Sequence, residues 1–141
     1  FVAIRPGGKE DSTTTYVAWE TTKGLSEMPS SLFYRGRVHF IRDGGMWTVV
    51  EPKTGKRLLD RERLGTGGQA VASPIAANGF IYTVNESGTF AMLRAGDALD
   101  VVAVNKLGES VRATPAIAGA TLYVRSSGNL WAFGAKPSVN P

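Results

Sequence analysis

The chain has 141 residues, of which 43% are apolar and 20% are charged, so a folded globular protein is expected and intrinsic disorder is not. It has no cysteine and a single histidine, His39, which excludes disulfide frameworks, thiol nucleophiles and multi-histidine metal sites. The formal net charge is +4, but the basic residues are scattered, and acidic residues interrupt the densest stretch, 53–63. Nucleic-acid binding is therefore not expected, and no apolar run approaches the roughly 20 residues that cross a membrane.

The N-terminal 25 residues predict two strands. Residues 1–5 and 16–20 are short apolar and aromatic runs, which favours strand over helix. They match the third and fourth strands of the repeated unit that follows.

Three similar segments come next, with prolines at positions 29, 74 and 115 that are 45 and 41 residues apart. Each has a proline-led apolar strand, a glycine turn, an aromatic-bearing strand, a second glycine turn and another apolar strand. The three successive strand regions lie at 29–36, 37–43 and 46–50, at 74–79, 80–85 and 89–93, and at 115–119, 121–125 and 129–133. The β-branched run 101–104 also favours a strand.

Alternation and turn chemistry support this interpretation. In the strand 37–43, Arg37, His39 and Ile41 fall on one face, and Val38 and Phe40 on the other. Glycine or asparagine at 43–45, 78–79, 87–88 and 127–128 suits hairpins, because both accept a positive φ at low cost. No long segment keeps a helical period, so the expected fold class is all-β.

Repeats of about 40 residues with four short strands are typical of β-propeller blades, which are four-stranded antiparallel sheets. The expected organisation of 1–134 is a trailing half-blade at 1–25, blades at 26–68 and 69–110, and a leading partial blade at 111–134, with a C-terminal tail at 135–141. A closed propeller needs about 4–8 blades, so these roughly three blades form a partial propeller. Either the parent chain is longer, or copies associate. In a dimer, the first strands of one chain would pair with the last strands of the other, giving six blades.

The segment 45–59 carries an aromatic third strand, the turn Lys-Thr-Gly-Lys at 53–56 and a leucine-containing fourth strand. Blades open with Ser-Pro at 73–74 and Thr-Pro at 114–115. Over residues 1–134 the chain thereby resembles the bacterial PQQ-like (pyrroloquinoline quinone repeat) β-propeller proteins. It departs from their pattern at Met28-Pro29 and in lacking a tryptophan after Lys56.

The resemblance implies a propeller architecture and, for most members of this kind, a noncatalytic scaffold that is periplasmic or secreted. Quinone-dependent dehydrogenases of the same family bind PQQ and calcium at the propeller axis. Their adjacent-cysteine ring is impossible here because the chain has no cysteine. No matching aspartate base or calcium-binding set is found in the sequence.

Three motifs were weighed as catalytic or cofactor-binding elements. The Gly-Thr-Gly-Gly-Gln-Ala segment at 65–70 fits a dinucleotide loop, but Pro74 follows too early for the required helix, so a linker between blades is expected. Lys-Thr-Gly at 53–55 lacks the Ser-x-x-Lys partner of penicillin-interacting enzymes and is interpreted as a turn. His39, within an alternating strand, is interpreted as a structural or surface residue.

Other conspicuous residues also receive structural interpretations. Trp19, Trp47 and Trp131 are expected to pack between blades. Asp60 and Glu62 are expected on a solvated outer strand, and Asp97 and Asp100 flank a turn with too few oxygen ligands for calcium. The Asn-Glu-Ser sequon at 85–87 is expected to be only a surface turn.

The sequence therefore predicts a noncatalytic propeller segment that binds a protein or a ligand, with no catalytic, cofactor-binding or metal-binding residue assigned. The expected partner is a second copy of the chain or another protein. The alternative is an enzyme, either a PQQ-dependent oxidoreductase or a hydrolase whose site forms between chains.

Overall fold

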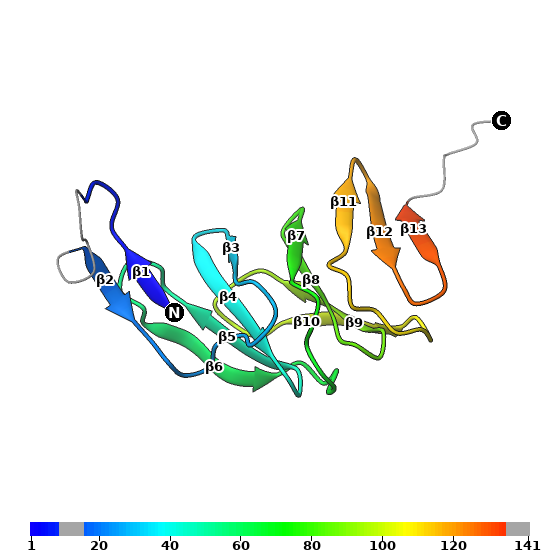
Figure 1. Cartoon of the computed structure of the whole chain (residues 1–141), viewed down its shortest axis with the longest axis horizontal. Helices are drawn as coiled ribbons and strands as arrows, with labels where there is room; N and C mark the ends of the chain where they lie inside the picture. The colour runs from blue at the N-terminus through cyan, green and yellow to red at the C-terminus, as the bar shows by residue number, and fades with distance from the viewer. Residues whose placement is uncertain (9–15, 135–141) are drawn as a thin grey trace.

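The computed structural model describes residues 1–8 and 16–134, and in this part of the chain all regular elements are β-strands (Figure 1). The N-terminal sheet contains β1 (Val2–Ile4) and β2 (Val17–Glu20). The second sheet contains β3 (Leu32–Tyr34), β4 (Arg37–Arg42), β5 (Met46–Val50) and β6 (Arg57–Arg63). The third sheet contains β7 (Ile75–Ala77), β8 (Phe80–Val84), β9 (Thr89–Arg94) and β10 (Val101–Lys106). The C-terminal sheet contains β11 (Ala116–Ala118), β12 (Thr121–Arg125) and β13 (Leu130–Gly134).

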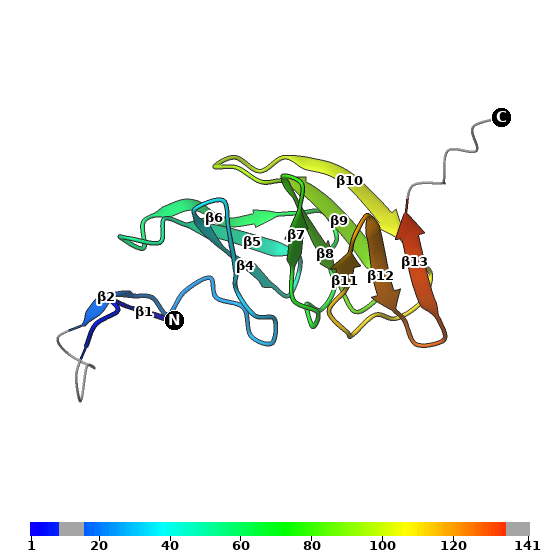
Figure 2. The same ribbon diagram turned by 90° about the horizontal axis from the view of Figure 1, so that it is seen from above.

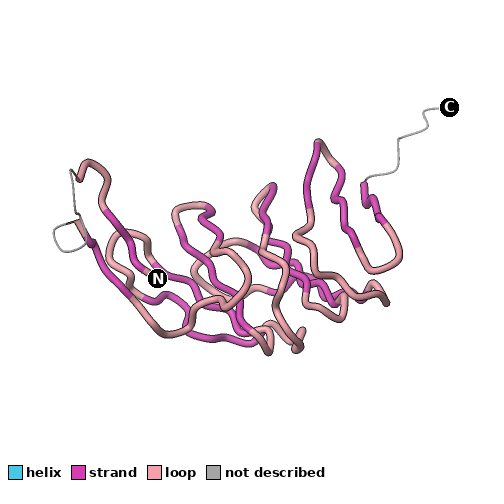
Figure 3. Tube along the Cα trace, viewed as in Figure 1, coloured by secondary structure: helices cyan, strands magenta, loops and turns pink. Residues whose placement is uncertain are grey.

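Each sheet is an antiparallel meander in which consecutive strands are hydrogen-bonded neighbours. The predicted all-β class is confirmed, and only strands and loops are drawn in the described parts of the chain (Figure 3). The described residues contain no helix that is long and apolar enough to cross a membrane. The four sheets lie within the four predicted segments, while the exact divisions at 25, 68 and 110 stay a prediction.

Tight turns connect the first two strands of the four-stranded sheets. Asn78 and Gly79 have φ values of 50° and 87°, and Arg35 and Gly36 have values of 48° and 71°. Two consecutive positive φ angles are the backbone requirement of a type I′ hairpin turn, whose twist matches that of the strands. The asparagine–glycine turn was predicted on this ground.

The sheets follow one another in chain order along an elongated molecule, with the N-terminal and C-terminal sheets at opposite ends (Figures 1 and 2). A separate cluster of buried apolar side chains lies at each of the three junctions between consecutive sheets. Each large apolar side chain that is fully buried contributes about 1.5–3 kcal/mol. These clusters, rather than one central core, hold the sheets together.

The cluster between the second and third sheets contains Ile41, Trp47, Val49, Leu64, Ala70, Ile81, Ala91 and Leu93. The cluster between the third and C-terminal sheets contains Ala72, Val84, Val111 and Val124, with Trp131 packed against it. The cluster between the N-terminal and second sheets contains Val38, Phe40 and Val50, with Trp19 packed against it. Each tryptophan thus belongs to a different junction, which confirms the prediction that all three pack between sheets.

The middle strands are buried on both faces. In β4, the four residues from Val38 to Ile41 are all buried, although they alternate between the two faces of the sheet. The reason is that the second sheet is covered by the N-terminal sheet on one side and by the third sheet on the other. The end sheets have only one covered face, and β11 is exposed throughout.

The sheets are also joined near their first strands by a series of hydrogen bonds to hydroxyl groups. The Ser30 amide donates to the Ser73 hydroxyl at 2.9 Å, and the Ser73 amide donates to the Thr114 hydroxyl at 3.0 Å. We call this series the hydroxyl relay. Ser30, Ser73 and Thr114 each lie two residues before the first strand of their sheet.

The relay corrects the alignment of repeats that the prolines suggested. Pro29 stands one residue before Ser30, whereas Pro74 stands one residue after Ser73. The equivalent positions are therefore separated by 43 and 41 residues instead of 45 and 41. In the second sheet the serine of the relay follows the proline, whereas in the third and C-terminal sheets the hydroxyl residue precedes it.

Candidate binding surfaces

Large apolar side chains are exposed at both ends of the molecule. On β1, Val2 and Ile4 are 48% and 63% exposed, and they lie on the face turned away from the second sheet. That orientation follows because Phe1 contacts Phe40 of the second sheet, with ring centroids 5.1 Å apart. We call this surface the N-terminal face.

The C-terminal sheet also has one covered and one open face. Leu122 and Phe133 are cross-strand partners that face the third sheet. Tyr123 and Leu130 lie on the opposite face and are 38% and 69% exposed. We call this surface the C-terminal face. Exposed apolar groups that gather in one place are typical of interaction sites.

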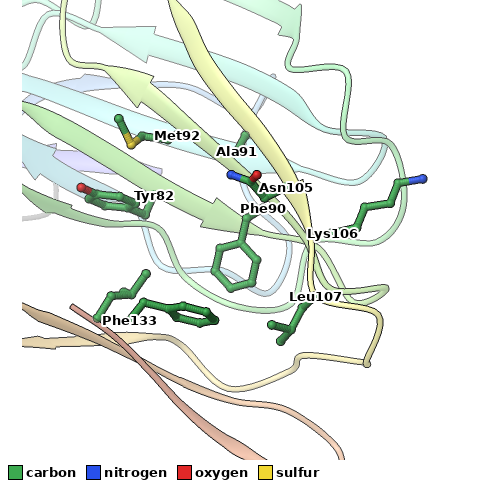
Figure 4. A pocket seen from close by; sticks show the side chains of 9 residues that line it. Tyr82, Phe90, Ala91, Met92, Asn105, Lys106, Leu107 and Phe133 are labelled. Carbon is green, nitrogen blue, oxygen red and sulfur yellow. The ribbon is translucent and has the colours of Figure 1, made fainter. Parts of the chain in front are cut away.

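A pocket of about 390 Å³ lies between the third and C-terminal sheets (Figure 4). Its lining is mainly apolar. The third sheet contributes residues of β8, β9 and β10 and the residue after β10, and the C-terminal sheet contributes residues of β12 and β13. The lining residues are Tyr82, Phe90, Ala91, Met92, Asn105, Lys106, Leu107, Leu122 and Phe133. The Lys106 ammonium points away from the ring of Phe90 at the centre of the view (Figure 4). The pocket therefore suits apolar groups more than anions.

This pocket has a filled counterpart at the preceding junction. There, Leu99 and Val101 of the third sheet pack against the cluster between the second and third sheets. Val101 belongs to β10, the fourth strand of its sheet. Among the described residues the C-terminal sheet has three strands, and none of them takes the position that β10 has in the third sheet.

His39 is buried in the second sheet and is 1% exposed. Its ring lies against Trp47, with centroids 5.4 Å apart. Neither ring nitrogen has a hydrogen-bond partner among the described residues. Burial lowers the pKa of His39; the backbone of Tyr34 partly opposes this effect, and the charge of Arg37 adds to it. The interpretation of His39 as structural is supported, and this neutral ring is remote from solvent.

The carboxylates are held in ion pairs and turn hydrogen bonds. Asp97 accepts from Arg37 at 2.6 and 2.9 Å, which lowers the pKa of that carboxyl and ties the second sheet to the third. Asp100 pairs with Arg94, and Asp60 pairs with two arginines of its own strand. The solvated strand predicted around Asp60 is observed.

Glu109 was not singled out in the sequence, yet it organises the turn between β12 and β13. Its carboxylate accepts from the Ser126 hydroxyl at 2.5 Å, the Asn129 amide group at 2.6 Å and the Gly128 backbone at 3.2 Å. The hydrogen bond from Ser126 is the main cause that lowers the pKa of Glu109. The residue thus links the connection after the third sheet to the C-terminal sheet.

Asn85 corrects the interpretation of the sequon as a surface turn. Its side chain is 5% exposed, because its amide group donates to the carbonyls of Thr66 and Gly67 and its oxygen accepts from the Thr89 amide at 2.8 Å. A carboxamide that joins two sheets in this way is inaccessible to a glycan. The missed signal is the Asn-x-Ser-x-Thr spacing at 85–89, in which the hydroxyl of Ser87 also bonds to Asn85.

Of the three motifs weighed as cofactor or catalytic elements, the two glycine-containing ones lie in connections between strands. The segment 65–70 joins β6 to β7 and is followed by a strand, so it lacks the helix N-terminus that a dinucleotide loop places against phosphate. The turn 53–55 joins β5 to β6, where the Thr54 hydroxyl donates to Glu51 at 2.6 Å and accepts from the Lys56 amide at 3.2 Å. The structure describes no group of three or more His, Asp or Glu side chains that could hold a metal ion.

No protein-family model and no curated protein sequence matches the chain. The structure, however, is similar to the crystal structure of BamB from Moraxella catarrhalis, with a TM-score of 0.68 and 20% sequence identity over 88% of this chain. The chain has the fold of a partial β-propeller. Its four sheets are therefore blades, and the matched region spans 38% of the BamB chain.

A second structural comparison is with the crystal structure of the computationally designed Ika4 protein, which has a TM-score of 0.55 and 14% identity. That match covers 75% of this chain and 64% of Ika4. At these identities, both likenesses concern the fold alone. The PQQ repeat remains a resemblance carried by the sequence motifs.

Proposed function

We propose that this propeller segment is a noncatalytic scaffold that binds another protein, in the periplasm or outside the cell. The observation that carries the proposal is the pair of exposed apolar faces at the two ends of the molecule. Val2, Ile4 and Leu130 project from sheets whose other faces are packed against neighbours. Large apolar side chains are costly to leave in water, and a group of them on one face is typical of protein-binding sites.

The distribution of titratable groups supports a scaffold rather than an enzyme. The sole histidine is buried with no hydrogen-bond partner for its ring nitrogens among the described residues, and the carboxylates discussed above are engaged by arginines or by turn amides. The apolar pocket offers a second surface, which a ligand or an apolar side chain of a partner would enter. The likeness to BamB is compatible with an extracytoplasmic location, which we propose and which cell fractionation would test.

Affinity capture tests the binding proposal. The immobilised chain is exposed to an extract of the source cells, alongside a Leu130→Asp variant and a Val102→Asp control. Val102 is 42% exposed on β10, outside the N-terminal and C-terminal faces. We expect a partner that the chain and the control retain and that Leu130→Asp loses. Equal capture by all three proteins would contradict binding through the C-terminal face. Turnover of a substrate by the chain alone would contradict the noncatalytic scaffold.

A further inference from the structure

We propose that an open pocket beside the connection from the N-terminal blade to the second blade binds a carboxylate, the side chain of an aspartate or glutamate in an acidic segment of the partner protein. This inference rests on the proposed protein-binding function and names the chemistry of the partner. Three features carry it, namely the cationic lining of the pocket, its unused hydrogen-bond donors and a strained arginine. The lining includes no residue of β1 or β13.

The pocket has a volume of about 310 Å³ and lies where the connection from β2 to β3 passes beside the second blade (Figure 1). Residues 22–27 of this connection form one wall, and Arg42 at the end of β4 and Arg61 of β6 form the other. Arg57 of β6 joins the two walls, because its Nη2 donates to the Lys23 carbonyl at 2.6 Å. We call this site the cationic pocket.

The charge of the cationic pocket favours an anion. Its lining has three cationic side chains, Lys23, Arg42 and Arg61, and one carboxylate, Glu27, so its net charge is +2. Glu27 accepts from Arg42 at 2.5 Å, whereas Lys23 forms no ion pair with any residue that the structure describes. An arriving negative group therefore meets more positive charge than the pocket itself neutralises.

Donors for such a group are present on both arginines. Arg42 uses only Nη2 in its pair with Glu27, so its Nε and Nη1 have no acceptor among the described residues. Arg61 reaches Asp60 with Nε and Nη2 at 3.3 Å, and its Nη1 has no acceptor in the described part of the chain. Hydrogen bonds from a guanidinium to a carboxylate are charge-assisted and about twice as strong as those between neutral groups.

The kind of anion follows from the kind of partner. The proposed partner is a protein, whose negative side chains are the carboxylates of aspartate and glutamate. Within this chain, Glu27 and Asp60 show that carboxylates approach these arginines. A free phosphate would use the same donors, so the test below compares the two.

Arg61 has a strained backbone at the pocket. Its φ is 59°, a left-handed value that costs free energy for residues other than glycine. Between two paired positions, Asp60 and Arg61 of β6 both lie opposite Thr48 of β5, which is a β-bulge. Bulges turn a side chain from its regular direction and are common beside functional sites. Glycine would adopt this backbone without strain but would leave the pocket without a guanidinium.

Peptide titration tests the proposal. The whole chain is titrated with a blocked peptide of consecutive glutamates, with the corresponding glutamine peptide and with inorganic phosphate, while NMR follows the backbone amides. We expect the glutamate peptide to shift the amides of residues 22–27 and of Arg61, and the glutamine peptide to shift neither. Binding of the glutamate peptide should weaken when salt is raised from about 50 to about 500 mM, because exposed ion pairs are screened.

Arg61→Gly separates binding from folding. Since glycine suits the φ of 59°, the midpoint of thermal unfolding should be no lower than in the parent. Affinity for the glutamate peptide should fall about tenfold with the loss of a charged donor. Arg35→Gly is the matched control, because Arg35 has a φ of 48° in the turn between β3 and β4, outside the pocket. It removes the same charge and should leave the affinity unchanged, whereas Lys23→Gln should weaken it.

Equal affinity of the parent and Arg61→Gly, an equal loss in Arg35→Gly, or shifts confined to other residues would overturn the cationic pocket as the binding site. Phosphate that binds more tightly than the glutamate peptide would overturn the assignment to a protein carboxylate.

Affinity capture distinguishes this inference from the scaffold itself. A partner that Leu130→Asp loses and that Arg61→Gly retains unchanged would overturn the role of the cationic pocket alone. Binding of the glutamate peptide by a chain that captures no partner would support the carboxylate site and contradict the scaffold.

Discussion

Gly55 shows how a single residue determines the packing between two blades. Its φ is 72°, and a Cβ atom at this position would lie 2.6 Å from the ring of Trp19. The indole in turn donates to the Pro52 carbonyl at 2.7 Å. The Thr-Gly turn therefore provides both the backbone conformation and the space in which an aromatic ring of the preceding blade lies.

Replacing Gly55 by alanine is expected to lower the free energy of unfolding by about 2–4 kcal/mol, since left-handed strain and overpacking add. Gly36 is the matched control, because its φ is 71° and a Cβ atom added there would meet nothing within 4 Å. Gly36→Ala should cost only about 1 kcal/mol, from backbone strain alone. Urea denaturation measures both values, and equal losses would show that the contact with Trp19 is unimportant.

His39 makes the stability depend on pH. Burial lowers the pKa of His39 in the folded chain below its ordinary value of 6.5. Well above pH 6.5 the ring is neutral in both folded and unfolded states, so the unfolding free energy is insensitive to this group. As the pH falls below that value, the unfolded chain binds the proton more readily, and stability decreases.

The expected result is a decline in unfolding free energy between pH 7 and pH 5 that is absent in His39→Leu. Leucine also removes two buried nitrogens that lack hydrogen-bond partners, so the variant should be at least as stable as the parent at pH 5. Denaturant titrations at several pH values provide the measurement. The same slope in both proteins would assign the pH dependence to other groups.

At the scale of elements, the hydroxyl relay connects blade to blade at their first strands. Ser73 takes part twice, as an acceptor through its hydroxyl and as a donor through its amide. Ser73→Ala removes only the acceptor and should lower stability by about 0.5–1.5 kcal/mol, the usual net value of one hydrogen bond.

Ser73→Thr keeps the hydroxyl and is expected to restore most of that stability. Thermal and denaturant unfolding of the three proteins distinguish the loss of the hydrogen bond from a general sensitivity of the position. If alanine and threonine were equally destabilising, steric fit rather than the hydroxyl would be responsible.

The order of the strands could be predicted from the sequence because turn residues and short apolar runs are local signals. The glycines at 44, 79 and 88 have positive φ in the turns where they were expected. The proline spacing aligned position 29 with position 74, whereas the hydroxyl relay makes Ser30 equivalent to Ser73. The actual marker, a hydroxyl two residues before the strand, depends on a partner about 40 residues away.

Side-chain burial and the candidate binding surfaces could be predicted less well from the sequence. The role of Asn85 depends on the carbonyls of the 65–68 segment, and the pocket requires side chains from two blades to be placed against each other. Such contacts are set by the stacking of sheets and not by the local pattern. For the same reason, strand alternation could not show that both faces of β4 are buried.

At the scale of the whole molecule, protection from solvent falls from the middle blades to the ends. The second and third blades are covered on both faces, and the end blades on one. Amide hydrogen exchange should therefore be slowest in β4, β5, β8 and β9, and faster in β1 and β13. Mass spectrometry after labelling for several times provides the measurement. Protection that is uniform along the chain would contradict the separate junction clusters as the main source of stability.

The hydroxyl relay has a consequence for how such molecules evolve. Each blade offers a hydroxyl to the one before it and an amide to the one after it, at separations of 43 and 41 residues. A tandem duplication of one blade would therefore meet the same chemical groups on both sides as the original did. As far as this contact is concerned, a duplicated blade would need no compensating change in its neighbours, so the relay sets no limit on the number of blades.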